Sequence, residues 1–470
     1  MAHLGAASDP KPVPPPGSGR SPPGPANRQP MTTSRSKLAA FALGAALTIP
    51  HAAFANIVEA NMISLQVQMR GQLLAENTDY GSGTAFEGNR TDLRFARFRL
   101  TLTGMMDENY GFQINTTSIT SSTKTGITGY GVSAQDVDYN DGNIRLHDGY
   151  FIANLRDWLN FKIGLTKIPL TRGNLDGCFD PLGIDRSMFS FSAYGTVPAK
   201  ASRDIGVTSW GRLADNRVVY QASIFQGREG ITRMTHPFTL ASVTSSPTPN
   251  ENFMYVGRIH YSFLDKEATS GYEGSYLGEL KVLTFGLGGI YEPAAVYRNV
   301  TAAGVVLNKE TVDYTAFTAD VLFEYPTSSG VYTITSAYLK NHFDDAYKTN
   351  FNPGDRLANI GGLNGQKEGW YVRGGYILPI TIGKKGKLQP YAYYEDWDLA
   401  QISGVTEQNI VQKAAGFNWY ITGNNNVRLT VEYQRNEFAK PTAFANGTVT
   451  SSVGTNRANT SIRTMFQVAF

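Results

Sequence analysis

From residue 62 onward the chain alternates hydrophobic and polar positions with a period of two. In the stretch 62–72, Leu65 and Val67 fall on one face of an extended backbone with other apolar side chains, and polar side chains occupy the opposite face. Residues 251–263 and 425–437 repeat the pattern. Because successive side chains of a β-strand point to opposite faces, this period predicts strands with one apolar and one polar face.

About sixteen such strands are predicted. They lie near 62–74, 91–105, 109–120, 142–154, 158–167, 202–213, 216–226, 251–263, 281–292, 313–326, 329–340, 369–380, 387–399, 409–421, 425–437 and 459–470. After the first strand, long connections alternate with tight turns. Two connections fit poorly: 264–280 is long where a turn is due, and 400–408 is short where a loop is due. An even number of strands with short turns at one rim and long loops at the other is typical of a bacterial outer-membrane barrel.

The last strand decides between this barrel and a soluble β-sandwich, which also has period two. Ile462, Phe466 and Val468 share one face with the terminal residue, Phe470. A C-terminal aromatic residue on an alternating strand resembles the signature by which outer-membrane barrels are recognised for assembly. We therefore predict an all-β fold, a transmembrane antiparallel β-barrel of about sixteen strands.

The N-terminal region predicts export. Residues 1–30 are rich in proline, cannot build a core and are not expected in the mature protein. Residues 31–55 read as a signal peptide, with a basic start, an apolar centre and the cleavage motif Ala53-Phe54-Ala55. The mature barrel would then span 56–470, in the outer membrane of a Gram-negative bacterium.

Processing changes the charge. The full chain has 42 basic and 39 acidic residues, but five basic residues and one acidic residue precede Asn56, which leaves 37 against 38. The mature protein therefore has no basic excess that would indicate a nucleic-acid partner. The single cysteine, Cys178, cannot form an internal disulfide.

The segment 168–201 is the longest candidate for a functional loop. It joins two predicted strands, and a connection of this length is either functional or disordered. Apolar residues favour the first choice, because a solvated linker would lack them: Leu170, Leu175, Phe179, Leu182, Ile184, Met188, Phe189, Phe191, Tyr194 and Val197. We predict that this third loop folds into the barrel and forms a constriction.

Three motifs resemble the phosphate-selective porin O and P family. They are the run 150–169, with its D-W-L turn and G-x-x-K-x-P ending, the run 93–100, and the S-R-D-I-G-V run 202–207. The resemblance implies a homotrimer of sixteen-stranded porins, a third loop that narrows each pore, and basic residues along the path. Family members that favour phosphate carry a dense arginine ladder. Here the basic residues of the loop are balanced by acidic ones: Arg172, Arg186, Lys200 and Arg203 against Asp176, Asp180, Asp185 and Asp204.

Arginines on the polar strand faces are the candidate selectivity residues, since fixed positive charge on a narrow wall selects anions. The candidate pore-lining residues are Arg97, Arg99, Arg70, Arg258, Arg373, Arg428 and Arg463, and the candidate constriction residues are Lys167, Arg172, Arg186, Lys200 and Arg203. Arg97 and Arg99 are the preferred pair, with Arg228 in an exposed loop as a contrast. The alternative is that wall arginines only pair with acidic residues such as Asp320, Glu324 and Glu432.

Little in the sequence indicates an enzyme. His260 and Ser262 share a face, but no third group completes a catalytic set. The histidines show no metal-ligand spacing, and the glycines at 286–289 lie inside a strand, so we expect no metal and no cofactor.

The predicted function is passive diffusion of small hydrophilic solutes, with mild anion preference and phosphate as one solute. The alternative is a barrel that sheathes a partner such as an electron-transfer cytochrome, or binds at the cell surface.

Overall fold

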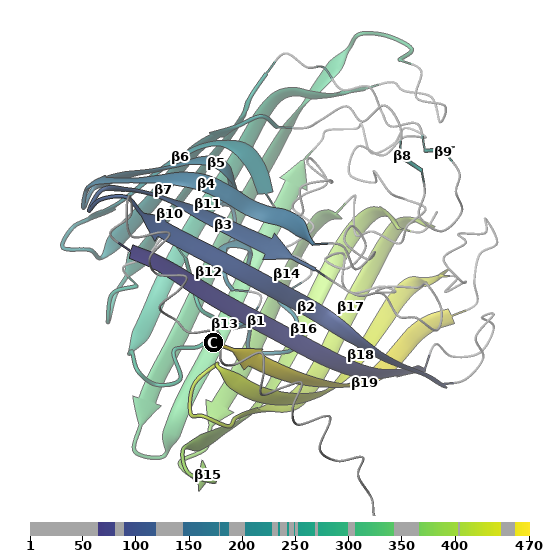
Figure 1. Ribbon diagram of the computed structural model, residues 1–470. Helices are drawn as coiled ribbons and strands as arrows, with labels where there is room; N and C mark the ends of the chain where they lie inside the picture. The colour runs from purple at the N-terminus through teal and green to yellow at the C-terminus, as the bar shows by residue number, and fades with distance from the viewer. Residues whose placement is uncertain are drawn as a thin grey trace, which may run out of the picture. The chain divides into compact units, whose positions relative to one another are not determined.

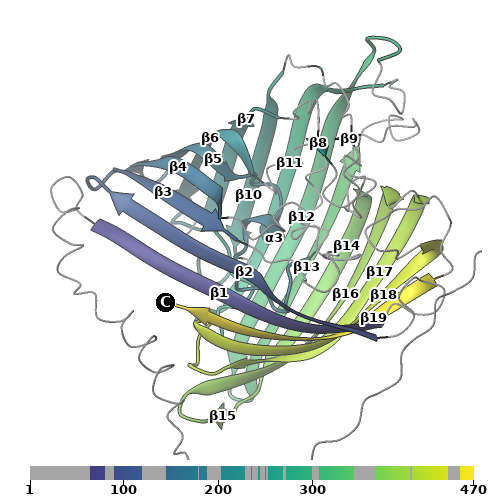
Figure 2. The same cartoon turned by 45° about the vertical axis from the view of Figure 1, so that its right-hand side comes forward.

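A closed antiparallel sheet forms the protein (Figure 1, Figure 2). The computed structural model describes residues 64–79, 89–118, 144–177, 179–187, 203–227, 234–235, 242–243, 249, 252–267, 271–298, 306–342, 366–402, 405–442 and 456–470. Within these residues the sheet has 17 strands, one of which, β15 (Thr381–Ile382), is a two-residue addition at a turn. The other sixteen pair in chain order, and β1 pairs with both β2 and β19, so the sheet closes.

Nine of the sixteen wall strands are longer than predicted, and the six from β3 to β10 are shorter. They are β1 (Ser64–Asp79), β2 (Asn89–Met105), β3 (Tyr110–Thr117), β4 (Arg145–Arg156), β5 (Leu159–Lys167), β6 (Arg203–Leu213), β7 (Val218–Phe225), β10 (Met254–Ser262), β11 (Val282–Tyr297), β12 (Thr311–Thr327), β13 (Gly330–His342), β14 (Gln366–Ile377), β16 (Gly386–Ile402), β17 (Val405–Tyr420), β18 (Val427–Thr442) and β19 (Asn456–Ala469). A separate pair consists of β8 (Met234–Thr235) and β9 (Ser242–Val243), and α3 (Arg172–Leu175) is a single helical turn. The prediction of an antiparallel barrel with about sixteen strands is confirmed.

Burial follows the predicted alternation. In β10 every second side chain from Met254 to Ser262 is buried, whereas Tyr255, Ile259 and Tyr261 are exposed. The polar side chains Arg258 and His260 belong to the buried set. The polar face therefore points into the barrel and the apolar face points outward, as a strand that crosses a lipid bilayer requires.

The first and last strands close the barrel. β1 and β19 pair from Arg70 opposite Ala469 to Asp79 opposite Thr460. Met69 N donates to Phe470 O at 2.7 Å, and Phe470 N donates to Met69 O at 3.0 Å. Closure satisfies the backbone groups of both edges, which a bilayer would otherwise leave without partners.

Period two along the second strand predicts that Ala96 shares the apolar, outward face of Phe98, and this prediction is wrong. The register between β1 and β2 shifts between Gln72 and Leu73, so Ala96 is the extra residue of a β-bulge. A bulge changes the face on which the next side chains fall. Ala96 is consequently buried on the inner side against Leu74 and does not share the outward face of Phe98.

The two irregular connections have different explanations. Ile402 of β16 pairs with Val405 of β17, so most of the short connection at 400–408 belongs to the two strands. The long connection at 264–280 folds into the barrel. Within the described residues no helix is long and apolar enough to cross a membrane.

Candidate functional site

Residues 168–187, apart from Cys178, form what we call the inner loop. Ile168, Leu170 and Ile184 are completely or almost completely buried, and α3 lies among the strands in Figure 2. The remainder of the predicted constriction loop, including Met188, Phe189, Phe191 and Lys200, lies outside the described residues. The contacts below show that the described part runs across the inside of the barrel.

The start of the inner loop is fixed by a short helical turn. Thr171 caps α3, because its Oγ1 accepts a hydrogen bond from Asn174 N at 3.0 Å. At the other end of α3, Lys167 Nζ donates to the carbonyl oxygens of Leu175 and Asp176 at 3.1 and 3.0 Å. Lys167 is the last residue of β5. It therefore both ends a strand and neutralises the carbonyl end of the helical turn.

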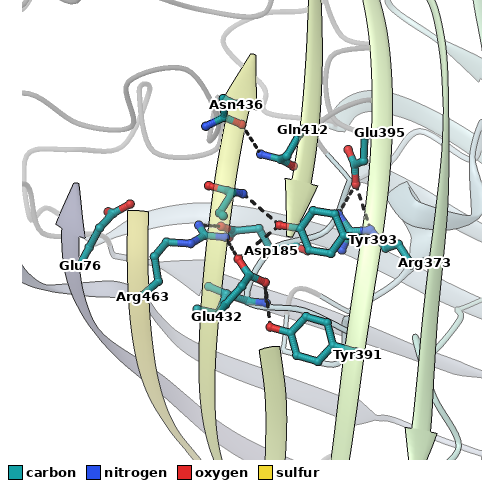
Figure 3. A network of polar contacts seen from close by, with 12 residues as sticks. Glu76, Asp185, Arg373, Tyr391, Tyr393, Glu395, Gln412, Glu432, Asn436 and Arg463 are labelled. Atoms are coloured by element: carbon teal, nitrogen blue, oxygen red, sulfur yellow. Dashed lines mark hydrogen bonds and ion pairs between the residues drawn. The ribbon is translucent and has the colours of Figure 1, made fainter. Parts of the chain in front are cut away.

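An ion-pair cluster on the far wall holds the end of the inner loop (Figure 3). Asp185 accepts a hydrogen bond from Arg97 of β2. It accepts a second one, at 2.7 Å, from Arg463 of β19. Arg463 also binds Glu432 of β18. Arg373 of β14 donates to the carbonyl oxygen of Asp185 at 2.6 Å. Burial by itself would raise the pKa of Asp185, but the Arg97 and Arg463 guanidiniums hold it well below its usual range.

Apolar contacts and backbone hydrogen bonds add to this anchor. Leu182 packs on Tyr391 and Tyr393, and Ile184 packs in the cluster that contains Ala96. Wall side chains also donate to loop carbonyl groups: Arg428 to Pro181 O at 3.0 Å and Asn418 to Leu182 O at 2.7 Å. Apolar residues in this loop thus serve as anchors, as the sequence indicates.

A second segment enters the barrel from the opposite rim. It is the connection 263–281 between β10 and β11, which we call the rim segment and which the structure describes except for 268–270. Arg172 of α3 donates to both carboxylate oxygens of Glu267 at 3.0 and 2.6 Å. Gly177 N donates to Tyr272 O at 3.3 Å. Burial opposes ionisation of Glu267, but the Arg172 guanidinium lowers its pKa to about 2.

The inner loop and the rim segment therefore meet inside the barrel and form a partition across it. No sequence argument predicted this contact, although the unexpected length of 264–280 was its signal. His260 and Ser262 belong to the same arrangement: Tyr272 OH contacts His260 Nδ1, and Ser262 Oγ accepts from Glu267 N at 3.3 Å. These two residues support the rim segment.

A cavity of about 380 Å³ lies between the partition and the wall formed by β3 to β7. Its charged lining residues are Lys162, Lys167 and Asp148. Asp148 accepts hydrogen bonds from Arg203 Nε at 2.9 Å and from Asn115 Nδ2 at 2.9 Å. The lining thus has two lysines, and its one carboxylate is already bound by an arginine.

Lys162 is the principal residue that the sequence analysis missed. Its Nζ lies 5.7 Å from the centroid of the Tyr150 ring and 5.9 Å from that of Trp210. The signal was present, because alternation along β5 places Lys162 opposite the outward-facing Ile163. Its position beside two aromatic rings depends on strand pairing and could not be read from that pattern.

The seven candidate wall arginines all have inner-side contacts, of different kinds. Arg258 binds both oxygens of Asp320 at 2.6 and 2.8 Å, and Arg70 pairs with Asp180 at 3.6 Å. Arg99 Nη2 lies 3.0 Å from His147 Nε2, and its guanidinium lies 5.6 Å from the centroid of the Phe179 ring. Their role in ion passage stays a prediction.

The candidate loop residues, and the acidic residues proposed to pair with the wall arginines, also have contacts of different kinds. Arg186 donates to the carbonyl oxygens of Gly173 and Asn174 at 3.1 and 3.0 Å. Arg203 is the first residue of β6 and not part of the loop. Asp320 and Glu432 pair with wall arginines, whereas Glu324 accepts from Ser275 Oγ and Gly278 N of the rim segment, each at 2.8 Å.

Comparison with known proteins agrees with this architecture. The family model described as phosphate-selective porin O and P matches residues 67–470. The anion-selective porin from Comamonas acidovorans has a TM-score of 0.50 and 11% identity, covering 87% of this chain and 99% of its own. OprB of Pseudomonas putida, in its high-pH structure, has a TM-score of 0.51 and 10% identity over 89% and 97%. At these identities the likeness shows the fold, and no curated protein matches in sequence. The family match covers most of the chain, which therefore belongs to the phosphate-selective porin O and P family and is a porin of the Gram-negative outer membrane.

Proposed function

We propose that the protein lets small hydrophilic solutes diffuse passively through the space between the partition and the β3 to β7 wall, with a preference for anions. The observation that carries the preference is the lining of the cavity, where Lys162 and Lys167 accompany one carboxylate, that of Asp148. Since Arg203 already binds that carboxylate, the local field is positive. A narrow, positively charged wall favours anions over cations.

Arg99 and Arg70 are the wall arginines that we propose to contribute most. Both guanidiniums lie 5.6 Å from the centroid of the Phe179 ring and are only partly buried. Arg97, in contrast, is buried and held by Asp185, so its charge serves the anchor of the inner loop. The pair Arg97 and Arg99 thus separates into an anchoring residue and a selectivity residue.

Phosphate would pass as one small anion among others. An arginine ladder would favour phosphate, but several wall arginines are neutralised in buried ion pairs, such as Arg258 with Asp320 and Arg373 with Glu395.

The alternative of a sheath for a partner protein is disfavoured, because the inner loop and the rim segment occupy the space that a threaded partner would need. We also propose the homotrimer of this family as the assembled form, which the mobility of unheated protein on a gel would test.

The test is the zero-current potential of the purified protein in planar bilayers under a KCl gradient. We expect the sign of an anion-preferring channel, and a shift toward cation preference in Arg99→Gln. The shift should be larger at 0.01 M than at 1 M salt, because the Debye length is about 30 Å at the lower concentration and only about 3 Å at the higher one.

The matched control is Arg435→Gln, because Arg435 is exposed on the outer side of β18 and pairs with Glu437 at 2.8 Å. This control should leave the potential unchanged. A wild-type potential of zero, or of the cation-preferring sign, would contradict the anion preference and leave the porin assignment intact.

A further inference from the structure

The cavity has a more specific construction than a positively charged passage requires. Tyr150, Lys162 and Trp210 come from the adjacent strands β4, β5 and β6. The pairing sets Lys162 opposite Thr208 and Ile152, so each ring lies one diagonal step from the lysine. The ammonium group therefore lies near two ring faces, an arrangement that cation–π attraction stabilises.

A glycine beside Lys162 allows β4 and β5 to approach closely. Gly164 follows Lys162 on the same face of β5 and has a φ of +135°, which favours glycine over any other residue. A Cβ at this position would lie 2.4 Å from the carbonyl oxygen of Gly149. Strands β4 and β5 thus pack closely next to the lysine, with the backbone of Tyr150 directly against Gly164.

The polar groups of the lining suit an anion. Lys162 and Lys167 supply ammonium groups, and Gln113 and Gln221 supply amides. Asp148 would repel an anion, but its carboxylate binds both Nε and Nη2 of Arg203, at 2.9 and 3.4 Å. A carboxylate on a solute would meet hydrogen-bond donors here, and such charge-assisted bonds are stronger than neutral ones.

The size of the cavity and its two rings suit an organic anion more than an inorganic one. The volume of about 380 Å³ lies within the range of roughly 300–1,000 Å³ that is typical of pockets for small organic ligands. An inorganic oxyanion would fill little of this space and would leave both rings facing water. Flat aromatic faces are favourable contacts for an apolar or planar group.

We propose that this cavity is a binding site for small organic carboxylates, with the carboxylate on Lys162 and the apolar part of the solute against Trp210 and Tyr150. The inference rests on the proposed function in that solutes must reach the cavity by diffusion. It names a class of solute that binds during passage, which a general preference for anions does not require.

The experiment measures block of KCl current through single channels by four probes. Benzoate has a charge and a ring, acetate only the charge, benzyl alcohol only the ring, and inorganic phosphate a charge without an apolar part. We expect benzoate to reach half-block at the lowest concentration. In Lys162→Gln the half-blocking concentration of benzoate should rise about tenfold, the effect of losing one charge-assisted hydrogen bond, whereas Lys162→Arg should keep most of the block.

Two further variants distinguish the contribution of the Trp210 ring to binding from an effect on folding. Trp210→Leu should weaken the block by benzoate and leave that by acetate unchanged, and Trp210→Phe should retain it. Lys281→Gln is the matched control, because Lys281 also lies 5.5 Å from the centroid of a tyrosine ring, that of Tyr325, but away from the cavity. Each variant is compared only after heat-modifiable mobility shows a folded barrel.

The outcomes distinguish the two proposals. Equal half-blocking concentrations for benzoate and acetate, or benzoate block unchanged in Lys162→Gln, would overturn the carboxylate site even if the channel prefers anions. A channel without anion preference that shows block dependent on Lys162 would overturn the proposed selectivity and support the site.

Discussion

Asp185 is the carboxylate on which the anchor of the inner loop depends, so Asp185→Asn is the most informative single change. The wild-type carboxylate binds two buried guanidiniums, those of Arg97 and Arg463. An amide of the same size can accept from one of them, but its NH₂ group would face the other. Arg463 would keep Glu432, and Arg97 would keep a 2.7 Å hydrogen bond to Gln72 Oε1. The loss therefore falls mainly on the contact between the loop and β2.

The magnitude follows from the burial of the pair. Removing one partner of a buried ion pair costs about 3–5 kcal/mol, because a charge stays buried without compensation. The remaining anchors include hydrogen bonds to Pro181 O and Leu182 O, each worth about 1 kcal/mol. Burial of the side chains of Leu182 and Ile184 adds about 1.5–3 kcal/mol each. The substitution thus removes roughly a quarter to a half of this local stabilisation and raises the released population of the loop by roughly 150- to 4,000-fold.

Single-channel recording measures this release. The Asp185→Asn channel should show larger current fluctuations and visits to a higher conductance level, since a released loop widens the passage. Barrel closure does not involve Asp185, so the heat-modifiable mobility of the folded protein should be retained. In the wild type the pKa of Asp185 is lowered, so its ion pairs stabilise the folded loop fully at pH values above the ordinary pKa of a carboxyl group. This stabilisation is lost as the pH falls into strong acid.

Glu437→Gln is the matched control. Glu437 also binds two cations, Lys413 and Arg435, both at 2.8 Å, but on the exposed side of the wall. Exposed ion pairs contribute about 0–1 kcal/mol, so this channel should behave as the wild type. If Asp185→Asn, in a folded barrel, gives the conductance and noise of the wild type, Asp185 does not hold the inner loop and the reasoning fails.

Two other predictions concern pH and processing. Burial, reinforced by the neighbouring Asp180, raises the pKa of Asp176 to about 8 from its ordinary value of 3.8, so the folded inner loop loses stability as pH rises between these values. Current noise should increase as pH rises from about 4 toward about 8 and level off above that value, and Asp176→Asn should abolish the increase; a pH-independent wild type would refute this. N-terminal sequencing of protein purified from outer membranes should begin near Asn56, and a start before Met31 would count against the signal peptide.

The sequence by itself determined the wall. Period two is a local property of the pleated backbone, so the sixteen strands and their outward faces, such as Tyr255 and Ile259, could be read without knowing any partner. The same holds for the apolar anchors of the inner loop and for the odd length of 264–280. The bulge at Ala96 could not be predicted from the sequence, because a residue is extra in one strand only by comparison with the strand that pairs with it.

Only the tertiary structure decided how the charges are used. Arg97 and Arg99 are equivalent in the sequence pattern, two residues apart on one face. Asp185 reaches Arg97 across 88 positions of the chain, whereas Arg99 lies beside His147. Lys162 likewise acquires its place between Tyr150 and Trp210 from the register of three strands. Alternation tells which way a side chain points, but closure of the barrel and the two segments that meet inside it determine what the side chain meets.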